Sequence, residues 1–104
     1  MGQLQLWIGL VDLRPFDRRS YGSAGAFTNI ITWASDQESF RSKVENLASS
    51  LEMFVIAVEW AEAVAERAKK WNTTEEIDDM IQRAEVNPEA IIYGTFHQYL
   101  NDEA

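Results

Sequence analysis

The side chains best suited to chemistry in this sequence lie in residues 91–99, close to its C-terminal end. The segment holds His97, the only histidine of the chain, and three polar or aromatic residues at alternate positions: Tyr93, Thr95 and Tyr99. Successive side chains of a β-strand point to opposite faces, so we expect these four residues to share one face. The opposite face would carry apolar residues suited to a core: Ile92, Phe96 and Leu100. A face that is both polar and aromatic is typical of a binding surface.

His97 is the side chain whose ordinary pKa lies nearest to neutral pH, which makes it the natural candidate for a general base. A catalytic histidine needs a nucleophile and a group that holds its tautomer. Its nearest neighbours on the expected face, Thr95 and Tyr99, do not supply that arrangement, so we assign no catalytic residue. With one histidine, no cysteine and no oxygen-rich calcium loop, the sequence also predicts no metal site and no cofactor.

A second candidate surface is acidic and precedes this segment. Thr73 and Glu76 have the spacing of a capping box, which predicts a helix that begins there and stops before Asn87-Pro88. Four carboxylates crowd the first turns, where the helix dipole favours negative charge: Glu75, Glu76, Asp78 and Asp79. They could form an ordinary solvated face or receive a basic partner.

Residues 26–34 are rich in threonine, isoleucine and aromatic types, which predicts a strand. One face of this strand would carry Phe27, Asn29, Ile31 and Trp33. We add Asn29 and Trp33 to the candidate binding residues.

The remaining segments predict the elements that position these residues. Residues 4–13 read as a strand ended by Pro15, and residues 14–25 as a long loop with three arginines. Ser35 and Glu38 predict the start of a helix, whose apolar stripe is Phe40, Val44, Leu47, Ala48 and Leu51. Residues 53–60 favour a buried strand, although one helix over residues 51–71 is the alternative. The last strand would span residues 90–99, and residues 101–104 would form a flexible tail.

The predicted order is therefore strand, strand, helix, strand, helix, strand, in one domain over residues 1–104. It indicates an α+β two-layer sandwich, loosely ferredoxin-like, with a four-stranded mixed sheet and both main helices on one face. The other face would then be exposed to solvent, buried in a homodimer or covered by a partner. The sequence does not choose among these.

Composition narrows the classes of partner. The chain of 104 residues has a net charge of −8; residues 1–35 carry +1 and the rest −9. Such a surface repels phosphate, which disfavours nucleic-acid binding, and attracts a basic protein partner. The alternative is that the negative charge serves only to keep the protein soluble. No apolar run is long enough to span a membrane, and the start of the chain does not read as a signal peptide, so we expect no membrane association and a cytoplasmic location.

The segments 26–34 (AFTNIITWA) and 93–99 (YGTFHQY) together resemble those of small, single-domain bacterial proteins without an assigned function. In size, acidity and lack of catalytic motifs, the chain is also similar, as a class, to bacterial immunity proteins, which neutralise a toxin by binding it. The second resemblance implies a non-enzymatic inhibitor of a basic protein. The alternative is a small ligand-binding domain or enzyme that dimerises through the open sheet face, with a pocket around His97.

Overall fold

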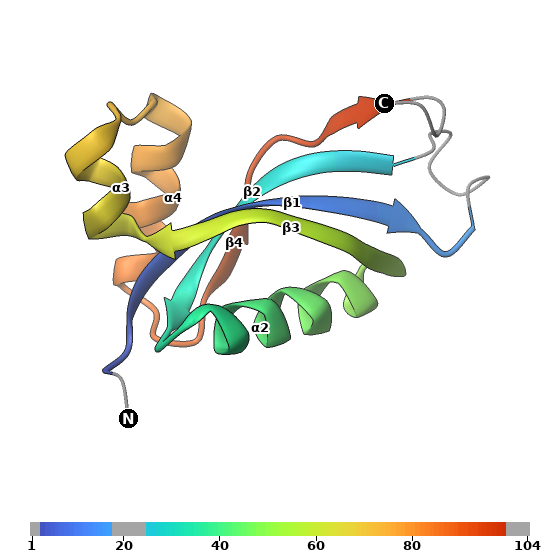
Figure 1. Cartoon of the computed structure of the whole chain (residues 1–104), viewed down its shortest axis with the longest axis horizontal. Coiled ribbons are helices and arrows are strands. Elements are labelled where there is room, and N and C mark those ends of the chain that lie inside the picture. The colour runs from blue at the N-terminus through green and yellow to red at the C-terminus, as the bar shows by residue number, and fades with distance from the viewer. Residues whose placement is uncertain (1–2, 18–24, 100–104) are drawn as a thin grey trace.

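A computed structural model describes residues 3–17 and 25–99 of the chain (Figure 1). Within these residues, five strands form one sheet: β1 (Gln5–Pro15), β2 (Gly25–Ala34), β3 (Met53–Ala63), β4 (Ile91–Tyr93) and β5 (His97–Tyr99). The same described residues form three helices beside it: α2 (Gln37–Ser50), α3 (Val64–Lys70) and α4 (Glu75–Glu85). The sheet order is β3-β1-β2-β4, and β5 also pairs with β2. The expected α+β sandwich of sheet and helices is confirmed.

The first core lies between α2 and one face of the sheet. Phe40, Val44 and Ala48 of the helix are fully buried against apolar side chains of the strands: Val11, Leu13, Ile30, Ala34 and Met53. Gly9 in β1 leaves the space that the Phe40 ring occupies, because a Cβ atom there would lie 2.7 Å from two ring carbons. The helix stripe predicted from the sequence therefore packs as expected.

A second core lies on the opposite face of the sheet. It joins Ile8 and Ile31 of the strands to Met80 and Ala84 of α4, with Ala90 beside them. Because Ile30 and Ile31 are consecutive in β2, they point to opposite faces. The expectation that both main helices share one face is therefore wrong. β2 is apolar on both sides; residues of α2 pack on one side and residues of α4 on the other. Figure 1 shows the two helices apart from each other.

The expected mixed sheet is also wrong, since every pairing among the described strands is antiparallel. α2 does join two strands that run in the same direction, β2 and β3, but β1 is inserted between them. β1 and β2 already form an antiparallel pair from Gln5↔Ala34 to Leu13↔Ala26, which leaves the far edge of β1 to receive β3.

The segment 53–71 is a strand followed by a short helix, so the alternative of one long helix is excluded. β3 is longer than the predicted 53–60 and reaches Ala63, because it pairs with β1 along its length, from Pro15↔Met53 to Trp7↔Ala63. This pairing overrides the helix propensity of its alanines. Its register shifts twice, opposite Leu10/Val11 and opposite Asp12/Leu13.

The helix starts differ from the prediction by one residue each. Asp36, not Ser35, caps α2 in a capping box with Ser39. Thr74, not Thr73, caps α4 by accepting a hydrogen bond from the Ile77 N–H.

The expected loop of residues 14–25 is shorter at both ends, because β1 continues to Pro15 and β2 begins at Gly25. Residues 18–24 and the expected tail, 101–104, lie outside the described residues. No helix in residues 3–17 and 25–99 has the length and apolarity needed to cross a membrane.

Candidate functional site

The predicted binding strand, residues 90–99, is broken in two, and the break changes which residues share a face. Tyr93 of β4 pairs with Ile30, and His97 of β5 pairs with Phe27. Residues 94–96 therefore lie opposite only Thr28 and Asn29, as in a β-bulge. The extra residue reverses the alternation, so Tyr93 lies on the α2 face and His97 on the α4 face.

His97 lies at a cleft between the α4 face of the sheet and the two helices α3 and α4. The cavity volume is about 290 Å³. Its polar and aromatic lining comes from both the strands and the helical segment: Asn29, Trp60, Arg67, Trp71, Glu76 and His97. Asn72, Thr73 and Thr74, just before α4, also line the cavity, together with Ile8 and Ile77. A larger hollow, of about 520 Å³, borders the outer edge of β3 near the start of α2, but no histidine lines it and its charged residues are all exposed. We take the cleft as the candidate site.

Glu76 lines one wall of this cleft, and Thr95 holds its carboxylate. The Thr95 hydroxyl donates to Glu76 Oε2 at 2.6 Å, and the Thr95 backbone N–H donates to Oε1 at 3.3 Å. These two hydrogen bonds, with the nearby His97 as a weaker contributor, hold the pKa of Glu76 below its ordinary value. Gly94 allows this approach, since a Cβ atom there would lie 2.6 Å from Glu76 Oε1. The carboxylate is thus oriented and ionised.

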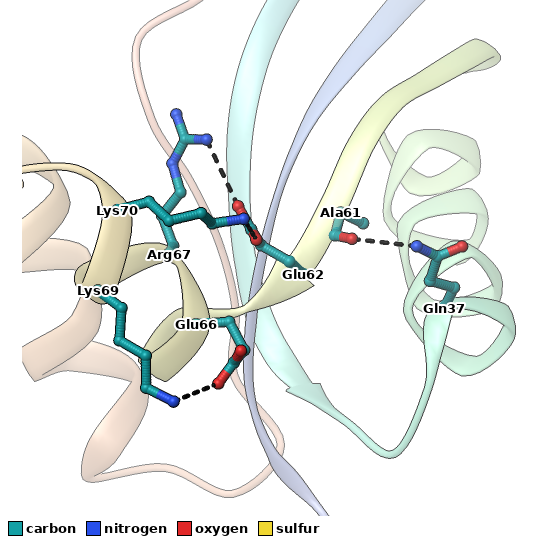
Figure 2. Close-up of polar contacts among 7 residues, drawn as sticks. All are labelled: Gln37, Ala61, Glu62, Glu66, Arg67, Lys69 and Lys70. Carbon is teal, nitrogen blue, oxygen red and sulfur yellow. Dashed lines mark hydrogen bonds and ion pairs between the residues drawn. The ribbon is translucent and has the colours of Figure 1, made fainter.

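A stack of two indoles and a guanidinium forms the other wall. The Arg67 guanidinium carbon lies 4.0 Å from the Trp60 ring centroid and 5.3 Å from the Trp71 centroid. Arg67 Nη1 is 3.4 Å from Glu62 Oε2, and Lys70 Nζ is 2.5 Å from Glu62 Oε1 (Figure 2). The hydrogen bond from Lys70, followed by its charge and by Arg67, lowers the pKa of Glu62. Arg67 is therefore held by cation–π contacts and by an ion pair together.

The structure brings together three predicted site residues, Asn29, Glu76 and His97, and Thr95 joins them through Glu76. Tyr93 lies on the other face, where its ring packs on Phe96 with a centroid distance of 5.4 Å. The backbone of Tyr99 pairs with Gly25, but its side chain lies outside the described part of the structure.

Trp33 is not part of the cleft. Its indole Nε1–H donates to the carbonyl oxygens of Ala84, at 2.9 Å, and Asn87, at 3.2 Å, which lie at the end of α4. These bonds hold α4 to the sheet, so the role of Trp33 in this structure is structural.

The other predicted acidic residues remain on the surface of α4. Glu75, Asp78 and Asp79 are exposed. Asp78 accepts a hydrogen bond from the Thr73 hydroxyl at 2.6 Å, and Asp79 pairs with Arg83 at 3.1 Å. We call Glu75, Glu76, Asp78 and Asp79 the acidic turn of α4. Trp71, which is 60% exposed, stands at the cleft only a few residues before this turn.

Sequence reasoning did not select Trp60, Arg67 or Trp71 as site residues. Their juxtaposition depends on the point where β3 ends and α3 begins, and this point could not be fixed from periodicity. The signal that was present is compositional: four tryptophans are many for 104 residues, and tryptophan and arginine are enriched at binding hot spots.

The arrangement can hold a ligand through several kinds of contact. It offers an oriented carboxylate, an imidazole, an amide and two indoles around one cavity. No group of three or more histidine, cysteine, aspartate or glutamate side chains within residues 3–17 and 25–99 could hold a metal ion. Comparison of the chain with family models, with curated proteins and with solved structures found no match.

Proposed function

We propose that this protein is a non-enzymatic, cytoplasmic binding protein that engages a basic protein partner, in the manner of an immunity-type inhibitor. The observation that carries the proposal is the position of the acidic turn of α4 beside the cleft. Carboxylates and an exposed indole ring, that of Trp71, are groups that recognise lysine and arginine side chains, by ion pairing and by cation–π contact.

The charge of the whole chain supports this proposal. A net charge of −8 draws a basic partner over long range and speeds its association, whereas phosphate backbones are repelled. The acidic turn then determines where such a partner docks, because Glu75, Asp78 and Asp79 are exposed on the same helical turns as Glu76, which lines the cleft. Binding through exposed charges weakens as salt is added.

The test compares two triple variants with the same net charge. Glu75→Gln/Asp78→Asn/Asp79→Asn neutralises the acidic turn, whereas Glu38→Gln/Glu45→Gln/Glu52→Gln neutralises exposed carboxylates on or next to α2. Their binding of a fluorescein-labelled basic decapeptide is followed by fluorescence anisotropy at two salt concentrations. We expect the first variant to lose about tenfold in affinity at low salt and the control much less. Equal losses would mean that binding follows net charge alone, and the proposed docking site would be wrong.

A second candidate function is a small ligand-binding domain that dimerises through its sheet. The observation in its favour is an apolar patch made by Phe16, Phe54 and Ile56, which are 51%, 57% and 44% exposed. The rings of Phe16 and Phe54 lie 4.5 Å apart. Patches of this kind mark interaction surfaces when they are large enough.

Sedimentation velocity tests this second function. It would show a dimer, and Phe54→Glu should dissociate that dimer. Val86→Glu, at a residue that is 84% exposed at the C-terminal end of α4, should leave the dimer intact. Thermal stabilisation by a ligand, abolished by His97→Ala, would favour this function over protein binding.

A further inference from the structure

The cleft already holds one guanidinium, that of Arg67, and the way it is held indicates what else the cleft can hold. The Trp60 and Trp71 rings contact it, at 4.0 Å and 5.3 Å from the centroids, and Glu62 pairs with it. We propose that the cleft binds an arginine side chain of the basic partner, in preference to a lysine. This inference rests on the proposed function and specifies the side chain that the site selects.

Exposed ring surface is available for a second planar cation. Trp71 lines the cleft, and the residue remains 60% exposed although Arg67 lies near its ring. A guanidinium is planar and weakly hydrated, and it stacks on an indole with little loss of solvation. An ammonium group is compact and strongly hydrated, and it gains less from the same ring.

Glu76 provides the matching anion. Thr95 donates one hydrogen bond to each carboxylate oxygen, from its hydroxyl to Oε2 and from its backbone N–H to Oε1. Each carboxylate oxygen can accept a further hydrogen bond. A guanidinium presents two parallel N–H donors to such a carboxylate, which an ammonium cannot do. The Thr95 bonds orient Glu76 before the partner arrives.

The charge of Arg67 does not close the cleft to a second cation. Glu62 lies 3.4 Å from Arg67 and offsets part of its charge, although Lys70 shares the same carboxylate. Glu76, on the other wall, is a carboxylate that Thr95 holds by hydrogen bonds and that faces the same cavity. A cavity of about 290 Å³ suits one long side chain rather than a large ligand.

The experiment uses two labelled decapeptides that differ only in having arginine or lysine at the same four positions, measured by fluorescence anisotropy in 0.15 M salt. We expect the full chain to bind the arginine peptide about twofold to fivefold more tightly. Trp71→Ala should abolish this preference and keep the salt-dependent binding of both peptides. Trp71→Phe should retain part of the preference, and Phe54→Ala, which removes an exposed ring outside the cleft, should retain all of it.

The outcomes separate the two proposals. If neither peptide binds, the proposed function is wrong. If both bind equally and with the same salt dependence, protein binding stands and the arginine preference is overturned. If Trp71→Ala keeps the preference, the arginine binds outside the cleft and the placement is overturned. Thermal unfolding of each variant, read by circular dichroism, shows that a loss of preference does not come from unfolding.

Discussion

Gly9 is the position where one added methyl group should disturb both the core and the site. A Cβ atom there would lie 2.7 Å from Cε1 and Cζ of Phe40 and 2.9 Å from the backbone carbonyl oxygen of Trp60. Phe40 has no exposed surface and is enclosed by the α2 core, so its ring cannot turn away freely. The carbonyl of Trp60 belongs to a strand paired with β1 and cannot move without disturbing that pairing.

The expected cost of Gly9→Ala follows from these contacts. Overpacking a core costs about 1–3 kcal/mol, and a backbone contact places this site in the upper part of that range. The substitution also lowers the conformational entropy of the unfolded chain, which stabilises the folded state by about 0.4–1 kcal/mol. We therefore expect a net loss of about 2 kcal/mol, or a fall in Tm of about 10 °C for a domain of this size.

Urea unfolding followed by circular dichroism measures this loss, and a double mutant identifies its cause. Phe40→Leu removes the ring atoms that the new methyl group would contact. Gly9→Ala in the Phe40→Leu background should therefore cost clearly less than in the original chain. A Gly9→Ala variant within about 0.3 kcal/mol of the original, or strict additivity in the double mutant, would refute the proposed packing of Phe40 against Gly9.

Two further predictions concern the site and the helix beside it. Thr95→Val removes the hydroxyl bond to Glu76, so the pKa of Glu76 should rise toward its ordinary value, as a carboxyl carbon NMR titration would show. Because the folded-state pKa of Glu76 is lowered, its stabilising contribution is present above the pKa of the unfolded chain and is lost as pH falls through the folded pKa. The stability difference between the two proteins should therefore be largest at neutral pH and shrink in acid, and a pH-independent difference would contradict this reasoning. Trp33→Phe removes the indole donor to the carbonyls of Ala84 and Asn87 and should cost about 1–2 kcal/mol in urea unfolding, with an unchanged stability contradicting the structural role assigned to Trp33.

Local patterns in the sequence located most elements to within a few residues. The strand at residues 26–34 and the α2 stripe of Phe40, Val44 and Ala48 are found where periodicity and capping residues predicted them. The predicted helix before Asn87-Pro88 is also present as α4. These features depend on neighbours in the chain, so the sequence carries them directly.

It was harder to predict which side chains share a face of the sheet and which helix covers that face, because both depend on contacts between distant segments. Ile30 and Ile31 are both fully buried, and alternation alone did not show that a helix covers each of them. The single extra residue between the two pairs Ile30↔Tyr93 and Phe27↔His97 separates Tyr93 from His97. One inserted residue reverses a strand's faces, and no propensity signals it apart from Gly94.

Only some of the residues that line the cleft could be predicted from the sequence, because the others meet through contacts between distant segments. Asn29, Glu76 and His97 were selected by residue type and position, and the fold places them together. Trp60 and Arg67 meet only because β3 extends to Ala63 before α3 begins, a boundary set by pairing with β1. Helix-favouring alanines on both sides of that boundary concealed it.

The most direct test of the central claim is an NMR titration of the ¹⁵N-labelled protein with the arginine decapeptide. If the cleft and the acidic turn of α4 form the docking site, the largest shifts should fall on the indole N–H signals of Trp60 and Trp71 and on the backbone N–H signals of Thr95 and His97. Signals of α2 should move little. Shifts concentrated on α2, or spread evenly over every acidic surface, would contradict the account.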